Sequence, residues 1–166
     1  MRLRTLVKTS AAVAAAAVAG SLATKPDSRW YKSLKKPSWQ PPPAAFPIVW
    51  TSLYALLAVA GARVLDRAPE SARAGFARSF GTNLVLNAGW TVVFFGARAP
   101  RAALAEIALL NASNLSLVTR AWRVDRPAAA AIAPYVVWTG FATALTASIA
   151  TRNPGAVRPG RADFRA

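Results

Sequence analysis

Long apolar segments alternate along the chain with short polar connections. Five apolar segments occupy residues 5–24, 44–65, 78–97, 101–121 and 128–151. Each holds about 20 residues or more, and a helix rising about 1.5 Å per residue then covers the apolar core of a bilayer, about 30 Å thick. The pattern therefore predicts an all-α integral membrane protein, with one domain over residues 1–153 that forms a bundle of five transmembrane helices.

The connections between these segments predict how the helices follow one another. Residues 97–101 and 122–127 are links too short for anything but antiparallel neighbours. Residues 66–78 carry several charges together with Pro69 and Gly75, which predicts a loop. Residues 154–166 are basic and hold two Pro-Gly pairs, so we expect a flexible tail after the last helix.

The first apolar segment has two interpretations. Residues 1–8 are basic and precede an Ala/Val run, and the small residues of Leu22–Thr24 could mark a cleavage site, as in a secretory signal. Against this, Ala12, Ala16 and Gly20 form a small-residue stripe typical of packed membrane helices, and four more membrane-length segments follow. These features favour a first transmembrane helix.

The connection after the first segment is rich in aromatic residues and proline. Residues 30–50 contain three of the six tryptophans and five prolines. Proline lacks a backbone N–H and disfavours helix in the residue before it, which predicts an ordered, extended or turning loop. Tryptophan and tyrosine concentrate where lipid tails meet headgroups. We therefore expect residues 25–43 to form a stiff aromatic lid at the membrane surface.

Composition narrows the chemistry. The chain is 54% hydrophobic, with a mean hydropathy of +0.28, and has neither cysteine nor histidine. This excludes thiolate catalysis, Ser-His-Asp triads, the usual zinc sites and the common haem ligands, so no metal site or resident cofactor is expected. The net charge of +15 comes from basic residues between the apolar segments. That placement favours the lipid bilayer rather than nucleic acid as partner. The basic residues split ten to eleven between the two sides, so they do not orient the protein.

Polar and aromatic side chains inside the apolar segments form helical stripes. The stripes are Trp50, Tyr54, Leu57 and Gly61; Asn83, Asn87, Trp90 and Phe94; Asn111 and Asn114; and Tyr135, Trp138, Ala142, Leu145 and Ile149. An aromatic interior with few hydrogen-bonding groups suits one flat, hydrophobic ligand. In the alternative interpretation the asparagines are interhelical contacts and the aromatic residues are packing or interfacial anchors. Glu106 could cap a helix start, paired with Arg98 or Arg101.

Four motifs carry a resemblance to a known family. They are WYKSLKKPSWQPP at 30–42, VWTSLYALL at 49–57, LNAGWTVVFFGAR at 86–98 and PYVVWTGFATAL at 134–145. In this order and spacing they resemble the TspO/MBR proteins, the tryptophan-rich sensory proteins of bacteria and the mitochondrial translocator protein, or peripheral benzodiazepine receptor.

The resemblance implies a five-helix bundle, usually a homodimer, with a pocket closed by the first loop. It also implies porphyrin ligands such as protoporphyrin IX or haem, and in many members cholesterol and benzodiazepine-type drugs. The implied membrane is the bacterial cell membrane, or the mitochondrial outer membrane in a eukaryote. The implied ligand-binding residues are Trp39, Trp50, Tyr54, Asn87, Trp90, Ala105, Leu109, Trp138, Ala142 and Leu145.

The chain departs from the family pattern at three places. The family's Leu-Asn pair on the last helix is Leu145-Thr146, and a tryptophan that animal members place early in the fourth helix is Ala102. The animal cholesterol motif requires a tyrosine that is missing between Leu145 and Arg152.

Three functions remain open at this point. The first is a porphyrin-binding sensor, chaperone or transporter. The second is a light-dependent porphyrin-degrading enzyme, in which the resemblance implies Trp50 and Trp138 as the reactive indoles. The third is a structural protein that uses the small-residue faces of its first and third helices only to dimerise.

Overall fold

The computed structural model describes residues 1–156, and all regular elements in that range are helices. Its elements are α1 (Leu3–Ala23), α2 (Arg29–Ser33), α3 (Ala45–Arg67), α4 (Glu70–Thr91), the π-helical turn η1 (Val92–Gly96), α5 (Pro100–Trp122) and α6 (Arg126–Arg152). The all-α prediction is confirmed for these residues. Most of the tail expected at 154–166 lies outside the described residues.

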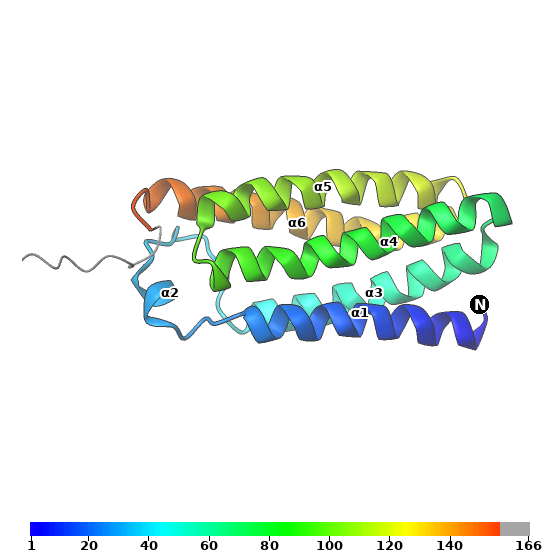
Figure 1. The fold of residues 1–166 in the computed structure, drawn as a ribbon, viewed down its shortest axis with the longest axis horizontal. Coiled ribbons are helices and arrows are strands. Elements are labelled where there is room, and N and C mark those ends of the chain that lie inside the picture. The colour runs from blue at the N-terminus through cyan, green and yellow to red at the C-terminus, as the bar shows by residue number, and fades with distance from the viewer. Residues whose placement is uncertain (157–166) are drawn as a thin grey trace, which may run out of the picture.

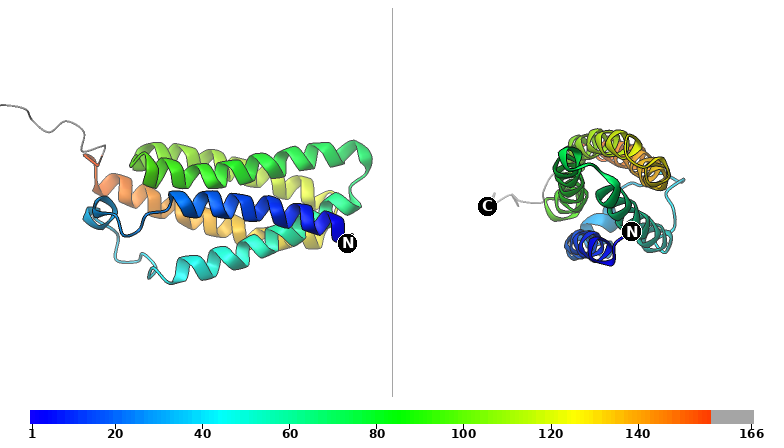
Figure 2. Two further views of the ribbon diagram at one scale, coloured as in Figure 1. Left: turned by 60° about the horizontal axis from the view of Figure 1, so that its bottom comes forward. Right: turned by 90° about the vertical axis from the view of Figure 1, so that its right-hand side faces the viewer.

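The long helices run side by side along one axis and close into a ring (Figures 1 and 2). Going around the ring, α1 packs on α3, α3 on α6, α6 on α5, α5 on α4, and α4 on α1. Met1 and the α3–α4 and α5–α6 connections lie at one end of the bundle, which we call the N-terminal end. The segment 24–44 and the last turn of α6 lie at the other, the loop end.

Four helices, α1, α3, α5 and α6, are long and apolar enough to cross a membrane. This makes the chain a multi-pass membrane protein. The remaining long helix, α4, is less apolar because it carries charged residues in its first half and asparagines in its second half. The structure therefore supports the predicted all-helical membrane architecture at the level of four spans.

The prediction of a loop at residues 66–78 is wrong. Helix α3 continues to Arg67 and α4 already begins at Glu70, so only Ala68 and Pro69 connect them. Pro69 stands just before the first helical residue, where a missing N–H costs nothing. The following residues are mostly good helix formers, and the burial of Phe76 outweighs the cost of a glycine inside the helix.

The proline-rich connection also contains a helix that the sequence did not predict. Ser28 caps α2, because its side chain accepts a hydrogen bond from the Tyr31 N–H at 3.3 Å. Residues 29–33 contain no proline, so their backbone can close a turn. The ordered, extended or turning loop expected from the prolines of residues 30–50 is therefore limited to the segment between α2 and α3, which contains turns at Pro37–Gln40 and Pro42–Ala45.

Two residues of the small-residue stripe of α1 pack inside the bundle, whereas Ala12 is exposed. Ala16 and Gly20 are buried, and a side-chain carbon at Gly20 would lie 3.6 Å from the Thr91 hydroxyl of α4. Thr9 donates a hydrogen bond to the Ala58 carbonyl of α3 at 2.9 Å. The first segment is thus an integral helix of the bundle.

A buried carboxylate fastens the N-terminal end. Asp125 accepts a hydrogen bond from the Ala128 N–H at 3.2 Å, which caps α6, and from Arg63 Nε at 3.1 Å. Arg67 pairs with the same carboxylate. Burial opposes ionisation of Asp125, but the hydrogen bonds and the two guanidinium charges outweigh it and hold the pKa of this carboxyl below its usual range. Asp125 therefore ties α3 to the start of α6.

Candidate ligand-binding site

Aromatic side chains gather where α3 faces α6. Trp50 and Tyr54, one turn apart on α3, have ring centroids 5.3 Å apart, and the Trp50 ring meets the edge of Tyr135 on α6 at 6.2 Å. Further along α6, Trp138 contacts Phe46 of α3 at 6.0 Å. The stripes predicted on these two helices do face each other, and their rings are in mutual contact.

The loop contributes one further ring to this face. Trp39 meets the edge of Phe141 at 5.7 Å, and Phe141 lies 5.2 Å from Trp138. Trp39 keeps 47% of its surface exposed. The loop thus places a partly open indole at the end of the aromatic row on α6.

One amide marks the polar side of the aromatic face. The Tyr54 hydroxyl donates to Asn87 Oδ1 at 2.7 Å, and Asn87 Nδ2 donates to the Tyr135 hydroxyl at 3.1 Å. Asn87 is buried, whereas Tyr54 is half-buried. Tyr54 is therefore the least buried of these three residues.

Behind Asn87 a hydrogen-bonded chain continues through the bundle. The Tyr135 hydroxyl donates to Asn83 Oδ1 at 3.1 Å, and Asn83 Nδ2 donates to Asn114 Oδ1 at 2.6 Å. Asn114 Nδ2 then donates to the Thr139 hydroxyl at 2.8 Å. For Asn83 and Asn114 the interpretation as interhelical contacts is the correct one, because their side chains are fully buried and paired.

Two threonines of α6 complete this chain and were missed in the sequence. The Thr139 hydroxyl donates to Asn111 Oδ1 at 2.9 Å, and Asn111 Nδ2 donates to the Thr143 hydroxyl at 2.8 Å. The two threonines are four residues apart and the two asparagines of α5 are three apart, so each pair lies about one turn apart on one face of its helix. That spacing was the available signal.

The loop is fastened to the end of α6 by one residue. Asn153 Oδ1 accepts from the Lys35 N–H at 2.9 Å, and Asn153 Nδ2 donates to the Lys35 carbonyl at 3.0 Å. Leu34, next to Lys35, is buried. No local pattern in the sequence indicates this contact, because the two residues are 118 positions apart.

A second aromatic group joins α2 to η1 and the end of α4, and it meets the α3–α6 face through Phe46 and Phe141, which pack against the same apolar cluster. It consists of Trp30, Tyr31, Trp90, Phe94 and Phe95, with Trp90 stacked on Phe94 at 5.0 Å. Burial raises the pKa of Tyr31. Among the predicted ligand-binding residues, Trp90 therefore belongs to this group, and Leu145 packs in the same apolar cluster.

The structure brings together about half of the predicted site. Trp39, Trp50, Tyr54, Asn87 and Trp138 lie around the α3–α6 face, and Ala142 is half-buried on the same helix as Trp138.

Ala105 and Leu109 do not join the predicted site, because both are exposed on the outer face of α5, Leu109 by 62%. The period of the helix explains this placement. Ala103, Ile107 and Leu110 occupy the buried face, and residues two positions away point to the opposite side.

Glu106 neither caps a helix nor forms an ion pair with Arg98 or Arg101. Within residues 1–156, both of its carboxylate oxygens are buried without a hydrogen-bond partner. One of them lies 3.6 Å from the position a side-chain carbon would take at Gly89 of α4. Because α5 begins at Pro100, Glu106 is more than one turn inside the helix, so the predicted cap is wrong.

Comparison with known proteins agrees with this architecture. Residues 9–152 match the TspO/MBR family. The chain belongs to this family. A tryptophan-rich protein TspO of Chlorobaculum tepidum is 39% identical over 139 residues, which cover 82% of this chain and 87% of the relative.

Two further relatives in the TspO/MBR family come from other organisms. Protein CrtK of Rhodobacter capsulatus is 37% identical over 127 residues, with 76% of this chain and 79% of the relative covered. The human translocator protein is 32% identical over 130 residues, with 76% of each chain covered. The resemblance predicted from the four motifs is thereby confirmed.

Proposed function

We propose that this TspO/MBR protein binds a porphyrin, such as protoporphyrin IX, against the α3–α6 aromatic face and acts as a sensor, chaperone or transporter. The observation that carries the proposal is the grouping of the Trp50 and Trp138 indoles with the Tyr54 phenol, next to the partly open Trp39 of the loop. Indole faces stack on a planar macrocycle, and a phenol hydrogen-bonds its edge.

In this proposal α4 is the fifth transmembrane helix. Its asparagines are turned inward, with Asn83 fully buried and hydrogen-bonded, so they impose little cost in a bilayer. Val85, by contrast, is 72% exposed on the outer face. Single-cysteine variants test this placement, since the chain has no cysteine of its own. We expect a membrane-impermeant maleimide to label Ser71→Cys from one side of the membrane and Arg98→Cys from the other.

Binding requires the site to open, because its rings contact one another in this structure. Trp50 meets Tyr135, and Trp138 meets Phe46 and Phe141. A macrocycle would have to separate some of these pairs. The partly exposed Trp39 and the hydrogen bonds of the loop to Asn153 make the loop end the expected route of entry.

Quenching of tryptophan fluorescence tests the porphyrin site. We expect protoporphyrin IX to quench the wild-type protein, and Trp50→Ala and Trp138→Ala each to raise the Kd at least about tenfold, since each removes a stacking surface. Trp122→Ala is the matched control, because Trp122 lies at the N-terminal end. An equal effect of all three substitutions would contradict the proposal.

The same titration distinguishes metal-free porphyrin from haem. The chain has no histidine or cysteine to bind iron, so we expect protoporphyrin IX to bind at least as tightly as haem. Haem binding that is much tighter, and that persists in Tyr54→Phe and Tyr135→Phe, would overturn this assignment.

Light-dependent degradation of the porphyrin is a second candidate function. It is favoured by the position of Trp50 and Trp138 on one site, because either indole could donate an electron to an excited macrocycle in the presence of dioxygen. Illumination of the complex would then bleach the porphyrin spectrum in the wild type but not in Trp138→Phe. Equal bleaching in that variant would exclude a role for this indole.

We also propose a homodimer, as the family resemblance implies. Molecular mass in detergent by light scattering tests the proposal: a mass of two chains per particle supports it, and a mass of one chain contradicts it.

A further inference from the structure

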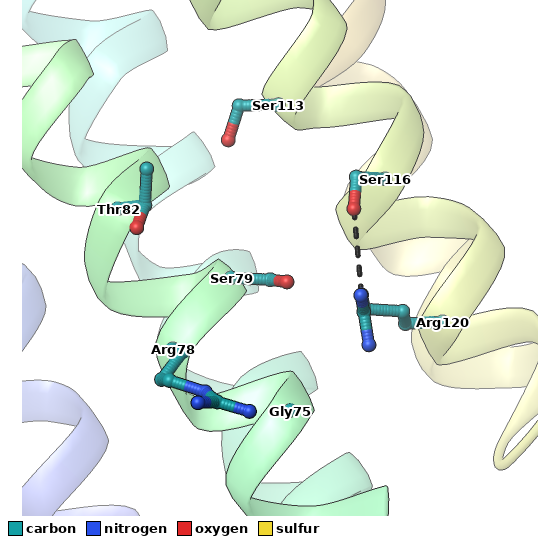
Figure 3. Close-up of a pocket in the computed structure, with 7 residues that line it drawn as sticks. All are labelled: Gly75, Arg78, Ser79, Thr82, Ser113, Ser116 and Arg120. Carbon is teal, nitrogen blue, oxygen red and sulfur yellow. Dashed lines mark hydrogen bonds between the residues drawn. The ribbon is translucent and has the colours of Figure 1, made fainter.

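A polar groove opens between α4 and α5, on the outer side of the bundle and toward the N-terminal end (Figure 3). Its volume is about 410 Å³. Two arginines and four hydroxyl residues line it: Arg78, Ser79, Thr82, Ser113, Ser116 and Arg120. Polar side chains that face outward from two packed membrane helices favour a polar occupant.

The charge of the groove selects an anion. Arg78 and Arg120 extend into the same space from the two helices (Figure 3). The ion pairs within residues 1–156 involve neither of them. The acidic residues of these helices, Glu70 and Glu106, lie two turns or more away along the chain. Two unneutralised guanidinium groups at one place attract an oxyanion and bind it through several N–H groups.

The groove is also supplied with hydrogen-bond donors. Ser116 Oγ lies 3.4 Å from Arg120 Nε, and Ser113 Oγ accepts from Asn83 Nδ2 at 3.3 Å. Each of these hydroxyls keeps its own hydrogen to donate. Gly75 leaves room for Arg120, because a side-chain carbon there would lie 3.0 Å from the guanidinium nitrogen. The groove thus presents two cationic groups together with free O–H donors.

The depth of the arginines and hydroxyls in the membrane indicates whether the anion is a lipid headgroup or a free ion. Trp122, at the end of α5, is 53% exposed and lies 5.5 Å from the Arg126 guanidinium, as expected of an interfacial anchor. Arg120 lies within one turn of Trp122. Ser113 lies seven residues before Arg120 on α5, which places it about 10 Å deeper in the membrane at 1.5 Å per residue. A phospholipid has the same order, with phosphate at the surface and ester carbonyls below.

We propose that this groove binds the headgroup of an anionic phospholipid, with Arg78 and Arg120 on the phosphate and the deeper hydroxyls on the glycerol esters. The proposal rests on the proposed crossing of the membrane by α4. It is independent of the porphyrin site, which lies toward the loop end of the other pair of helices.

Native mass spectrometry of the full-length protein, with phosphatidylglycerol and phosphatidylcholine offered in equal amounts, tests this site. We expect the wild type to retain phosphatidylglycerol at least about fivefold in preference to phosphatidylcholine. Arg78→Gln/Arg120→Gln should abolish the preference. The matched control is Arg4→Gln/Arg123→Gln, which removes the same charge from exposed positions at the same end of the bundle and should keep the preference within about twofold.

A second groove variant and a measurement of porphyrin binding complete the test. Thr82→Val/Ser113→Ala keeps both arginines and should lower the retention of phosphatidylglycerol severalfold. Porphyrin quenching should be unchanged in both groove variants, which shows that they fold and separates this proposal from the proposed function. Equal losses in the groove and control variants would overturn the lipid site. So would competition by millimolar inorganic phosphate, which would indicate a site for the free ion.

Discussion

The two ends of the bundle are held by different chemistry. At the N-terminal end, Asp125 joins α3 to α6 through two arginines, and Asp66 accepts hydrogen bonds from Thr5 at 2.6 Å and from the backbone of Arg2. At the loop end, ring contacts and the Asn153 amide join the loop to the helices. Charged pairs resist separation in one fixed geometry, whereas rings can slide and re-pack. The difference indicates that the N-terminal end is the fixed part and the loop end the part that opens.

The largest effect on stability is expected when the charge of Asp125 at the N-terminal end is removed. We expect Asp125→Asn to lower the free energy of unfolding by about 2 kcal/mol, since two partly buried arginines lose their partner while the cap of α6 can persist. Denaturant unfolding in detergent measures it. Asp27→Asn is the control at the loop end, where the pair with Lys32 is exposed and should contribute less than about 0.5 kcal/mol. Equal losses would show that the ends do not differ.

Acidification should weaken the N-terminal end selectively. The pKa of Asp125 is lowered in the folded protein, so its contribution is fully present above the unfolded value, about 3.9, and is lost as pH falls through the lower folded value. We expect the Tm of the wild type to fall below about pH 4, and that of Asp125→Asn to fall less. Parallel curves would show that other carboxyl groups account for the loss.

At the loop end a substitution should affect opening more than stability. Asn153→Ala removes both hydrogen bonds to Lys35, and we expect it to lower the free energy of unfolding by about 1 kcal/mol. Association of protoporphyrin IX in stopped-flow quenching should become faster. Asn153→Asp, which keeps an acceptor for the Lys35 N–H, should give an intermediate rate. An unchanged rate in both variants would mean that the loop does not limit entry.

The smallest expected effect concerns the turn between η1 and α5. Arg98 has a φ of 54°, a left-handed conformation that an arginine adopts at a cost. Arg98→Gly should raise the free energy of unfolding by about 0.5 kcal/mol, because relief of strain exceeds the added flexibility of the unfolded chain. Arg98→Ala keeps a side-chain carbon and should give no gain. A gain in both variants would indicate an effect of charge instead of backbone.

Local patterns in the sequence were sufficient to predict most of the helices. Apolar length located the helices within a few residues, and the aromatic stripes of α3 and α6 do face each other. The start of α4 was missed because Pro69 and Gly75 suggest a loop, while the burial of Phe76 that stabilises the helix depends on tertiary packing. Ser28 was not recognised as a helix cap because the prolines that follow it at positions 37–47 favoured a loop for the whole connection.

The site was less predictable because it depends on which helices are neighbours. Trp50 and Trp138 lie on the facing stripes of α3 and α6, as the period of each helix predicted. Trp90 lies with the rings under α2, and Leu109 faces outward, because the ring order of the bundle decides which stripe meets which. The contact between Asn153 and Lys35 depends on chain segments far apart in sequence, which no local pattern reveals.

The row of amides and hydroxyls from Tyr54 to Thr143 has a mechanical consequence. Each donor in it faces an acceptor on a different helix, across α3, α4, α5 and α6. Sliding any one of these helices by a single turn, about 5.4 Å, would break its links together and leave several buried polar groups unmatched in a dry interior. The row therefore fixes the axial register of the four helices. Aromatic side chains on either side of it can move without any of these helices sliding along its axis.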